Sequence, residues 1–303
     1  MTQPSFAGLW PVMLTPFRDD GAIDWPSVDA LVDWYLEKGA PGLFAVCQSS
    51  EMFALSPDER LQLARSVVAR AADRVPVVAS GTFGGPVAEQ ADFVRRMADT
   101  GVASVVVLTN QFNPPAADED DFRSPLEELV ALTDPVPLGL YECPVPYKRL
   151  LSPRLLAWAA STGRFLYHKD TLCDMEPLKA KIDAVRGTDL ALFNANTPTA
   201  LASLQYGAAG ISPIAANIYP ELFAWLCSHP REAEAPDLQR LLAVMEGIVV
   251  MRYPVGAKHA MHRRGLPISL KCRNADIELN ADDRELLRYL LETVDQLNEK
   301  LAL

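Results

Sequence analysis

The feature that most constrains the fold of this chain is a regular alternation of short β-branched runs with amphipathic helical stretches. This alternation is typical of repeated βα units around a parallel sheet whose strands are buried on both faces. Eight runs are strand candidates, at residues 9–15, 42–47, 75–81, 104–109, 137–143, 165–170, 190–194 and 210–214. Eight units of about 25 to 30 residues have the size of a TIM barrel. We therefore predict an α/β fold, a (β/α)8 TIM barrel with a C-terminal helical extension.

The helical stretches carry start and stop signals. Ser56-Pro57-Asp58-Glu59 has the pattern of a capping box with proline at the first helical position, and it opens a predicted helix at residues 58–72. Glycine follows two other predicted helices, at residues 88–100 and 153–162. The main rival, a doubly wound sheet, needs a Gly-rich phosphate loop after an early strand. No βα junction carries GxGxxG or a Walker A sequence, so we favour the barrel.

The βα repeat ends near residue 230. A proline-rich break at residues 230–236 precedes helical stretches at residues 238–253, 256–264 and 282–301. The last stretch has one apolar face, which should pack on the barrel or on a neighbouring subunit. We predict a barrel over residues 1–230 and a helical extension over residues 231–303.

Charge and hydropathy narrow the classes of partner. The chain has 28 basic and 39 acidic residues, so a nucleic-acid or anionic-membrane partner would bind against a net charge of −11. No signal-peptide pattern is present at residues 1–7, and no 18 apolar residues run together. We expect a cytoplasmic protein with a small-molecule partner, neither nucleic acid nor membrane.

The cysteines and histidines favour neither a disulfide framework nor a metal site. The five cysteines are far apart, odd in number and without a CxxC pair. His259 and His262 are spaced i, i+3, but no third ligand is visible nearby. We expect no metal and no organic cofactor.

Lys169 is the leading candidate for chemistry. Active sites of TIM barrels are built at the C-terminal ends of the strands, and Lys169 ends a strand that must be largely buried. Burial lowers a lysine pKa and frees a nucleophilic amine able to form a Schiff base. The alternatives are an ion pair with Asp170 or Glu51, or a side chain that extends to solvent. Tyr141 ends the preceding strand and could relay protons, or it could be an ordinary core aromatic.

The loop after the second strand is a candidate carboxylate site. Ser49 and Ser50 supply two hydroxyls, and backbone N–H groups lie just before a helix start. The alternative is a serine turn with a helix cap. Glu51 next to them is predicted to be structural, pairing beneath the barrel mouth.

Together these residues resemble a known family. Over nearly its whole length the chain is similar to the dihydrodipicolinate synthase and N-acetylneuraminate lyase superfamily of class I aldolases. Tyr141 and Lys169 are 28 residues apart, which is the spacing of that family. The other matching pieces are residues 8–17, Ser50-Glu51 with residues 55–60, residues 138–141 with Pro144, Asp170, residues 207–210 with Ala216-Asn217, Lys258 and Arg273.

The resemblance implies a mechanism and a site. Lys169 would form an imine with pyruvate or another 2-oxo acid, and Tyr141 would relay protons. Ser49, with backbone around Ser49 and Ser50, would hold the substrate carboxylate, and main chain near Ile211 and Ser212 would close the pocket. The family is a homodimer or homotetramer and needs no metal or organic cofactor. The iminium would act as an electron sink for aldol cleavage, condensation or dehydration.

Several departures from the family pattern bear on the substrate. The family's Gly-Thr-Thr-Gly-Glu is Cys47-Gln48-Ser49-Ser50-Glu51 here, and its paired tyrosines after the fourth strand are Gln111-Phe112. The arginine that synthases use for the carboxylate of aspartate semialdehyde falls on Pro146, with Lys148 and Arg149 in another register. Glu142 replaces the usual asparagine. A missing bidentate arginine is hard to replace, because it leaves an anionic group unpaired.

Three functions follow in order of preference. The first is a Schiff-base lyase, an aldolase or dehydratase acting on pyruvate or a 2-oxo acid such as a 2-keto-3-deoxy sugar acid. The second is 4-hydroxy-tetrahydrodipicolinate synthase, which joins pyruvate and aspartate semialdehyde. The third is an inactive barrel with a binding or regulatory role, since fold never fixes function.

Side-chain parity adds one expectation. Because side chains alternate along a strand, Tyr141, Tyr167 and Lys169 should face the lumen, while Glu142 and His168 should face the helices.

Overall fold

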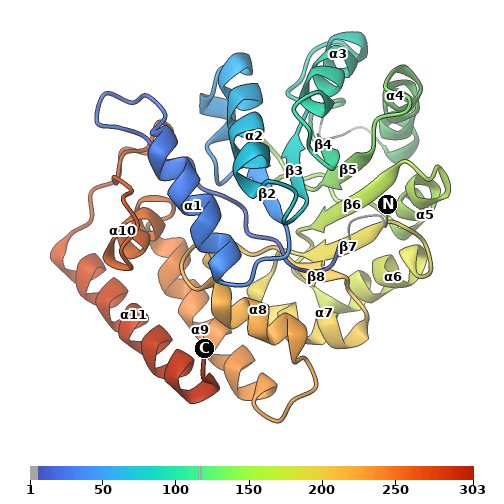
Figure 1. Cartoon of the computed structure of the whole chain (residues 1–303). Helices are drawn as coiled ribbons and strands as arrows, with labels where there is room; N and C mark the ends of the chain where they lie inside the picture. Colours follow the sequence, from blue (N-terminus) through green and yellow to red (C-terminus); the bar gives the residue numbers. More distant parts are fainter. Residues whose placement is uncertain (1–5, 115, 117) are drawn as a thin grey trace.

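The computed structural model describes residues 6–114, 116 and 118–303 and is a (β/α)8 barrel, as predicted. Eight strands lie inside a ring of helices (Figure 1). The strands are β1 (Gly8–Leu9), β2 (Leu43–Val46), β3 (Val77–Ser80), β4 (Ser104–Leu108), β5 (Leu138–Tyr141), β6 (Phe165–Asp170), β7 (Ala191–Asn194) and β8 (Gly210–Ile211). All of their pairings are parallel, in the order β1-β8-β7-β6-β5-β4-β3-β2.

The helices that follow the strands cover the outside of the barrel. They are α1 (Trp25–Glu37), α2 (Pro57–Ala71), α3 (Val87–Ala98), α4 (Glu119–Leu132), α5 (Pro153–Ser161), α6 (Met175–Val185), α7 (Ala200–Tyr206) and α8 (Pro220–Ser228). The predicted capping box is confirmed, since the Ser56 hydroxyl accepts from Glu59 N and the Glu59 carboxylate accepts from Ser56 N. Within the described residues no helix is both long and apolar enough to cross a bilayer. The cytoplasmic location stays a prediction.

The barrel closes where the segment after β1 changes partner. Trp10 N donates to Ile211 O on the β8 side, whereas Phe44 N donates to Pro11 O and Met13 N to Phe44 O on the β2 side. Glycine allows this close approach, because a Cβ at Gly210 would lie 2.0 Å from Gly8 O. The sheet is thus closed by one short segment, residues 8–13, that forms hydrogen bonds first with β8 and then with β2.

Seven of the eight predicted strands are shorter in the structure, and the first, fifth and last differ most at their C-terminal ends. The first was predicted to reach residue 15, but β1 ends at Leu9, and the segment that follows pairs with β2, where Phe44 N donates to Pro11 O. The last was predicted to reach residue 214, and Pro213 ends it before a short 3-10 helix at Ile214–Asn217. The fifth was predicted to reach residue 143, but it ends at Tyr141, and Cys143 N turns back to donate to Tyr141 O.

The interior of the barrel is filled by aromatic side chains beneath Lys169. Tyr167 lies at the centre of this layer, with its ring centroid 5.3 Å from that of Trp10, 4.8 Å from Phe193 and 5.7 Å from Phe44. All four rings are fully buried, so the barrel is a packed core with no open channel at this level.

Three helices form the C-terminal extension: α9 (Ala235–Met251), α10 (Val255–Arg263) and α11 (Ala281–Leu301). Helices α9 and α11 pack against α8, and α10 packs against α9 and α11 (Figure 1). The predicted boundary at residue 230 falls between α8 and α9, and the division into two units there stays a prediction. Two ion pairs hold the extension to the barrel: in a fully buried pair Lys258 Nζ lies 3.0 Å from Glu51 Oε1, and in a half-buried pair Arg273 binds Glu59 through both of its Nη atoms.

Candidate active site

Lys169 and Tyr141 lie side by side at the C-terminal ends of adjacent strands. They are register partners of β6 and β5, and Lys169 Nζ is 4.8 Å from the centroid of the Tyr141 ring. Both side chains are almost fully buried, and Phe44 packs edge-on against Tyr141 at 5.6 Å. The two candidates therefore meet at the barrel mouth, as the parity of the strands predicts.

Lys169 differs from the other two buried lysines. Lys181 and Lys258 bind carboxylates, whereas Lys169 pairs with no carboxylate in the described part of the chain. The ion pairs considered for Lys169 are not formed, because Asp170 binds Lys181 and Glu51 binds Lys258.

The environment of Lys169 makes its ammonium group easier to deprotonate than that of an ordinary lysine. Burial lowers the pKa of Lys169 from 10.5 to about 8, while the nearby thiols of Cys47 and Cys143 act in the opposite direction. Burial raises the pKa of Tyr141 well above its ordinary value, so the phenol keeps its proton at neutral pH. Burial thus increases the fraction of neutral Lys169 amine beside a protonated phenol, and this pair could add to a carbonyl and move a proton.

The loop after β2 uses its two serines differently. The Ser50 hydroxyl accepts from Cys47 N at 2.8 Å and donates to Cys47 O at 2.6 Å, while Ser50 O accepts from the Thr15 hydroxyl at 2.7 Å. Ser50 thus closes the serine turn weighed above, whereas the Ser49 N–H donates to no backbone carbonyl of the described residues. Ser49 is the member of this pair whose N–H can bind a ligand, and the Ser50 assignment stays a prediction.

Ile211 and Ser212 lie at the end of β8, and their main-chain groups form hydrogen bonds with neighbouring segments of the barrel. Ile211 O accepts from Trp10 N, Ser212 N donates to Asn194 O, and the Ser212 hydroxyl donates to Trp10 O. Their role in closing a substrate pocket stays a prediction.

Tyr253 was missed by the sequence reasoning. It follows α9, and its phenol oxygen accepts from Asn217 Nδ2 at 3.1 Å. Burial raises the pKa of Tyr253 well above its ordinary value, and the Ser49 side chain acts against this rise. The extension therefore brings a phenol to the candidate carboxylate site, although nothing in the local sequence around Tyr253 indicated it.

The residues at the departures from the family pattern are engaged in structural contacts. Phe112 packs against Phe122, with ring centroids 5.9 Å apart. Lys148 Nζ donates to Thr171 O at 2.8 Å, and Arg149 donates to Pro114 O at 2.7 Å. The Asn110 Nδ2 amide lies within hydrogen-bond distance of three carbonyls of the loop after β5, those of Cys143, Val145 and Tyr147. This loop is thus tied to the barrel around the candidate site.

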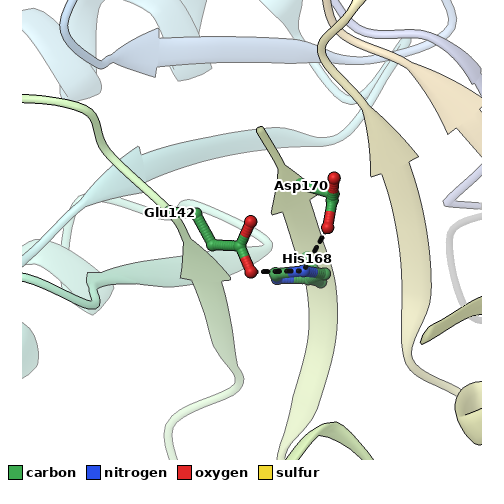
Figure 2. Close-up of side chains that lie close together, drawn as sticks. All are labelled: Glu142, His168 and Asp170. Atoms are coloured by element: carbon green, nitrogen blue, oxygen red, sulfur yellow. Dashed lines mark ion pairs between the residues drawn. The ribbon is translucent and has the colours of Figure 1, made fainter. Parts of the chain in front are cut away.

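Glu142, His168 and Asp170 form a second buried cluster, on the helix side of the same strands (Figure 2). His168 Nε2 lies 3.7 Å from Glu142 Oε1 and 3.8 Å from Asp170 Oδ2. Lys181 Nζ, from α6, lies 2.6 Å from each of these carboxylates. The outward direction predicted for Glu142 and His168 is confirmed. Although these three residues have the donor types of a metal site, the Lys181 ammonium already occupies the cation position between the carboxylates.

The opposite face of the barrel is a poor candidate for the active site. A depression of about 1350 Å³ lies there, with Gly8, Val77 and Ala209 in its wall, next to the N-terminal ends of the strands. Lys169 and Tyr141 lie at the other ends. Catalytic residues of TIM barrels come from the C-terminal ends, so the Lys169 site is the better candidate.

Comparisons with known proteins agree with the fold and with the sequence resemblance. The model of the dihydrodipicolinate synthetase family matches residues 5–294. A 4-hydroxy-tetrahydrodipicolinate synthase of Haloarcula marismortui is 28% identical over 305 residues, which cover 97% of this chain and 96% of the relative.

Solved structures extend the comparison. The chloride-inhibited dihydrodipicolinate synthase of Acinetobacter baumannii, complexed with pyruvate, is 26% identical with a TM-score of 0.85, covering 95% of this chain and 99% of that one. YagE, a prophage protein of E. coli K12, has a TM-score of 0.85 at 23% identity over 96% and 99% of the two chains, which shows the shared fold. The predicted class, a lyase of the class I aldolase type, is the class of the matched family. With a family model that covers almost its whole length, the chain belongs to the dihydrodipicolinate synthetase family.

Proposed function

We propose that this chain is a Schiff-base-forming lyase in which Lys169 forms an imine with pyruvate or a related 2-oxo acid. The observation that carries the proposal is a buried lysine without a carboxylate partner, with a pKa lowered to about 8, beside the Tyr141 ring. The A. baumannii relative complexed with pyruvate supports the choice of substrate.

The imine forms by addition and loss of water. The neutral Lys169 amine adds to C2 of the 2-oxo acid, and the carbonyl oxygen takes up a proton. The nitrogen then gives up a proton, and the new hydroxyl leaves as water once it is protonated. The products are an iminium and one water molecule. Tyr141, whose phenol stays protonated, hands protons between nitrogen and oxygen, and the iminium then accepts the electron pair of a bond broken at the neighbouring carbon.

The substrate carboxylate would be held by Ser49. Its N–H group has no backbone partner among the described residues, and its side chain lies next to Tyr253. The Ser50 turn shapes the loop, and Ile211 and Ser212 line the far side of the mouth. We expect no metal and no organic cofactor in this chemistry.

For the complete substrate we favour a 2-keto-3-deoxy sugar acid. No arginine stands at position 146, where synthases would hold the carboxylate of aspartate semialdehyde, and Lys148 and Arg149 are bound to loop carbonyls. The alternative is 4-hydroxy-tetrahydrodipicolinate synthase, which the name of the H. marismortui relative favours. An inactive binding or regulatory barrel is the third possibility.

The test is intact-protein mass spectrometry after incubation with pyruvate and borohydride, which reduces an iminium to a stable amine. We expect a pyruvyl adduct on the wild type and on Lys148→Ala, a control at an exposed lysine of the same mouth, but none on Lys169→Ala. No adduct on the wild type, with pyruvate or longer 2-oxo acids, would favour the binding role. If the adduct forms, product assays with 2-keto-3-deoxy acids and with pyruvate plus aspartate semialdehyde separate the two enzymes.

A homodimer or homotetramer is also proposed, from the family resemblance. Sedimentation velocity over a range of protein concentrations tests it, and a monomer at all concentrations would contradict it.

A further inference from the structure

The buried cluster behind the active site joins three elements of the barrel. Lys181 of α6 donates to Glu142 Oε1, directly after β5, and to Asp170 Oδ2, at the end of β6. Both contacts measure 2.6 Å, and all three side chains are buried. One ammonium group therefore links the ends of two neighbouring strands to the helix that covers them.

The same carboxylates also hold the loops that leave these strands. Glu142 accepts from Leu151 N at 2.8 Å and from Thr171 N at 3.1 Å, while Asp170 accepts from Leu172 N at 2.8 Å. Buried carboxylates need such partners, because an unpaired charge in a dry environment is costly. The cluster thus fixes the main chain that follows the ends of β5 and β6.

The position of the cluster relative to the active site is equally specific. Glu142 directly follows Tyr141, and Asp170 directly follows Lys169. Since neighbouring side chains of a strand point to opposite faces, the cluster lies behind the pair that faces the lumen. A displacement of either carboxylate would move the backbone that carries Tyr141 or Lys169.

We propose that Lys181, with Glu142 and Asp170, positions Lys169 and Tyr141 for imine formation by clamping the ends of β5 and β6. This inference rests on the proposed function, because it assumes that Lys169 is the reacting amine. Lys181 is a positioning residue here, since it acts through the two strands and touches no substrate.

Charge balance makes the two carboxylates unequal. One ammonium group cannot neutralise two buried carboxylates, so a neutral cluster holds one additional proton. Burial raises the pKa of Glu142, and the Asp170 carboxylate raises it further. For Asp170 burial acts upward too, but His168 and Lys181 hold its pKa below the ordinary value. Asp170 is therefore the more acidic of the two carboxyl groups, and Glu142 takes up a proton before Asp170 as the pH falls.

The first experiment compares Lys181→Met with Lys179→Met. Lys179 is the matched control on the same helix, because its ion pair with Glu176 is exposed. The time course of borohydride trapping at several pyruvate concentrations gives a maximal rate and a half-saturating concentration. For Lys181→Met we expect a maximal rate lowered about 10- to 100-fold, because small displacements of reacting groups are costly, with a half-saturating concentration within about threefold of wild type. Lys179→Met should match the wild type.

Hydrogen exchange measured by mass spectrometry supplies a readout that needs no imine. We expect Lys181→Met to lose protection in peptides that contain residues 138–152 and 165–172, but not in α11. If Lys181→Met does not fold, the double variant Lys181→Met/Asp170→Asn is used in its place, because it removes one charge of each sign.

The second comparison is Asp170→Asn with Glu142→Gln. The loss of maximal rate should be larger for Asp170→Asn, because Asp170 is the more acidic of the two carboxyl groups beside Lys181.

The outcomes separate the two proposals. If no adduct forms on the wild type, the proposed function is wrong. If hydrogen exchange is also unchanged in Lys181→Met, Lys181 does not hold the ends of β5 and β6 together. An adduct that forms at the wild-type rate in Lys181→Met overturns the positioning role, even if exchange shows a loosened structure. Equal losses in Asp170→Asn and Glu142→Gln overturn the unequal charge assignment.

Discussion

Tyr141 and Lys169 are paired across β5 and β6, and the Lys169 ammonium nitrogen lies 4.8 Å from the centre of the Tyr141 ring. The proposed nucleophile, Lys169, and the proposed proton carrier, Tyr141, are thus both carried by strands of the sheet and not by loops. Sites built on strands hold their geometry more closely than sites built on loops.

The first prediction concerns the Tyr141 hydroxyl. Tyr141→Phe should slow pyruvyl-adduct formation by about 10²- to 10⁴-fold, the range typical of a lost proton-transfer group. Its half-saturating pyruvate concentration should change little, because Ser49 is untouched. Trapping kinetics check this, and a wild-type rate in Tyr141→Phe would remove the hydroxyl from the mechanism.

The second prediction is the pH dependence of imine formation. Only the neutral amine can attack, and the pKa of Lys169 is lowered to about 8 by burial. The trapping rate at saturating pyruvate should therefore rise with pH up to about 8 and then level off. A rate that keeps rising toward pH 10 would mean that Lys169 titrates as an ordinary lysine.

The third prediction is that the same burial reduces the stability of the fold. The pKa of Lys169 is about 8 in the folded state and 10.5 ordinarily, so the unfolded chain binds more protons between these values. Deprotonation of Lys169 should therefore make the free energy of unfolding rise as the pH increases from about 8 to about 10.5. Lys169→Met should lack this rise and should be more stable at pH 7, by up to roughly 3 kcal/mol. Urea unfolding of both proteins at pH 7 and pH 10 checks this, and a destabilised Met variant would contradict it.

The fourth prediction concerns the phenol of the C-terminal extension. Tyr253 lies beside Ser49, the residue proposed to hold the substrate carboxylate. Tyr253→Phe should raise the half-saturating pyruvate concentration several-fold and change the maximal trapping rate less. The matched control is Tyr289→Phe, at an exposed tyrosine of α11. Unchanged saturation in Tyr253→Phe would exclude a role for this phenol in binding.

The strand pattern was sufficient to predict the barrel, because eight buried runs with regular spacing leave few alternatives. Residues 165–170 were predicted with the correct ends, since Gly163 and the polar pair Lys169-Asp170 bound that run clearly. The other seven strands were predicted too long, with the largest errors at the C-terminal ends of the first, fifth and last. A hydrophobic run shows which residues are buried, but not where proline interrupts a ladder or where a segment changes partner.

The site was predictable only where it follows from position on a strand. Lys169 and Tyr141 end neighbouring strands, so parity and the barrel rule place them together. Lys181 and Tyr253 lie on or after helices, 11 and 36 residues from their partners Asp170 and Asn217. Their contacts depend on how each helix packs on the barrel, which periodicity alone does not determine.

The most direct test of the account is peptide mapping of the wild-type protein after trapping with pyruvate and borohydride. The account predicts that the pyruvyl group is found on Lys169 and on no other lysine, including Lys148 at the mouth and Lys181 behind the site. A pyruvyl group on another lysine, or on none, would contradict the central claim that Lys169 is the imine-forming residue.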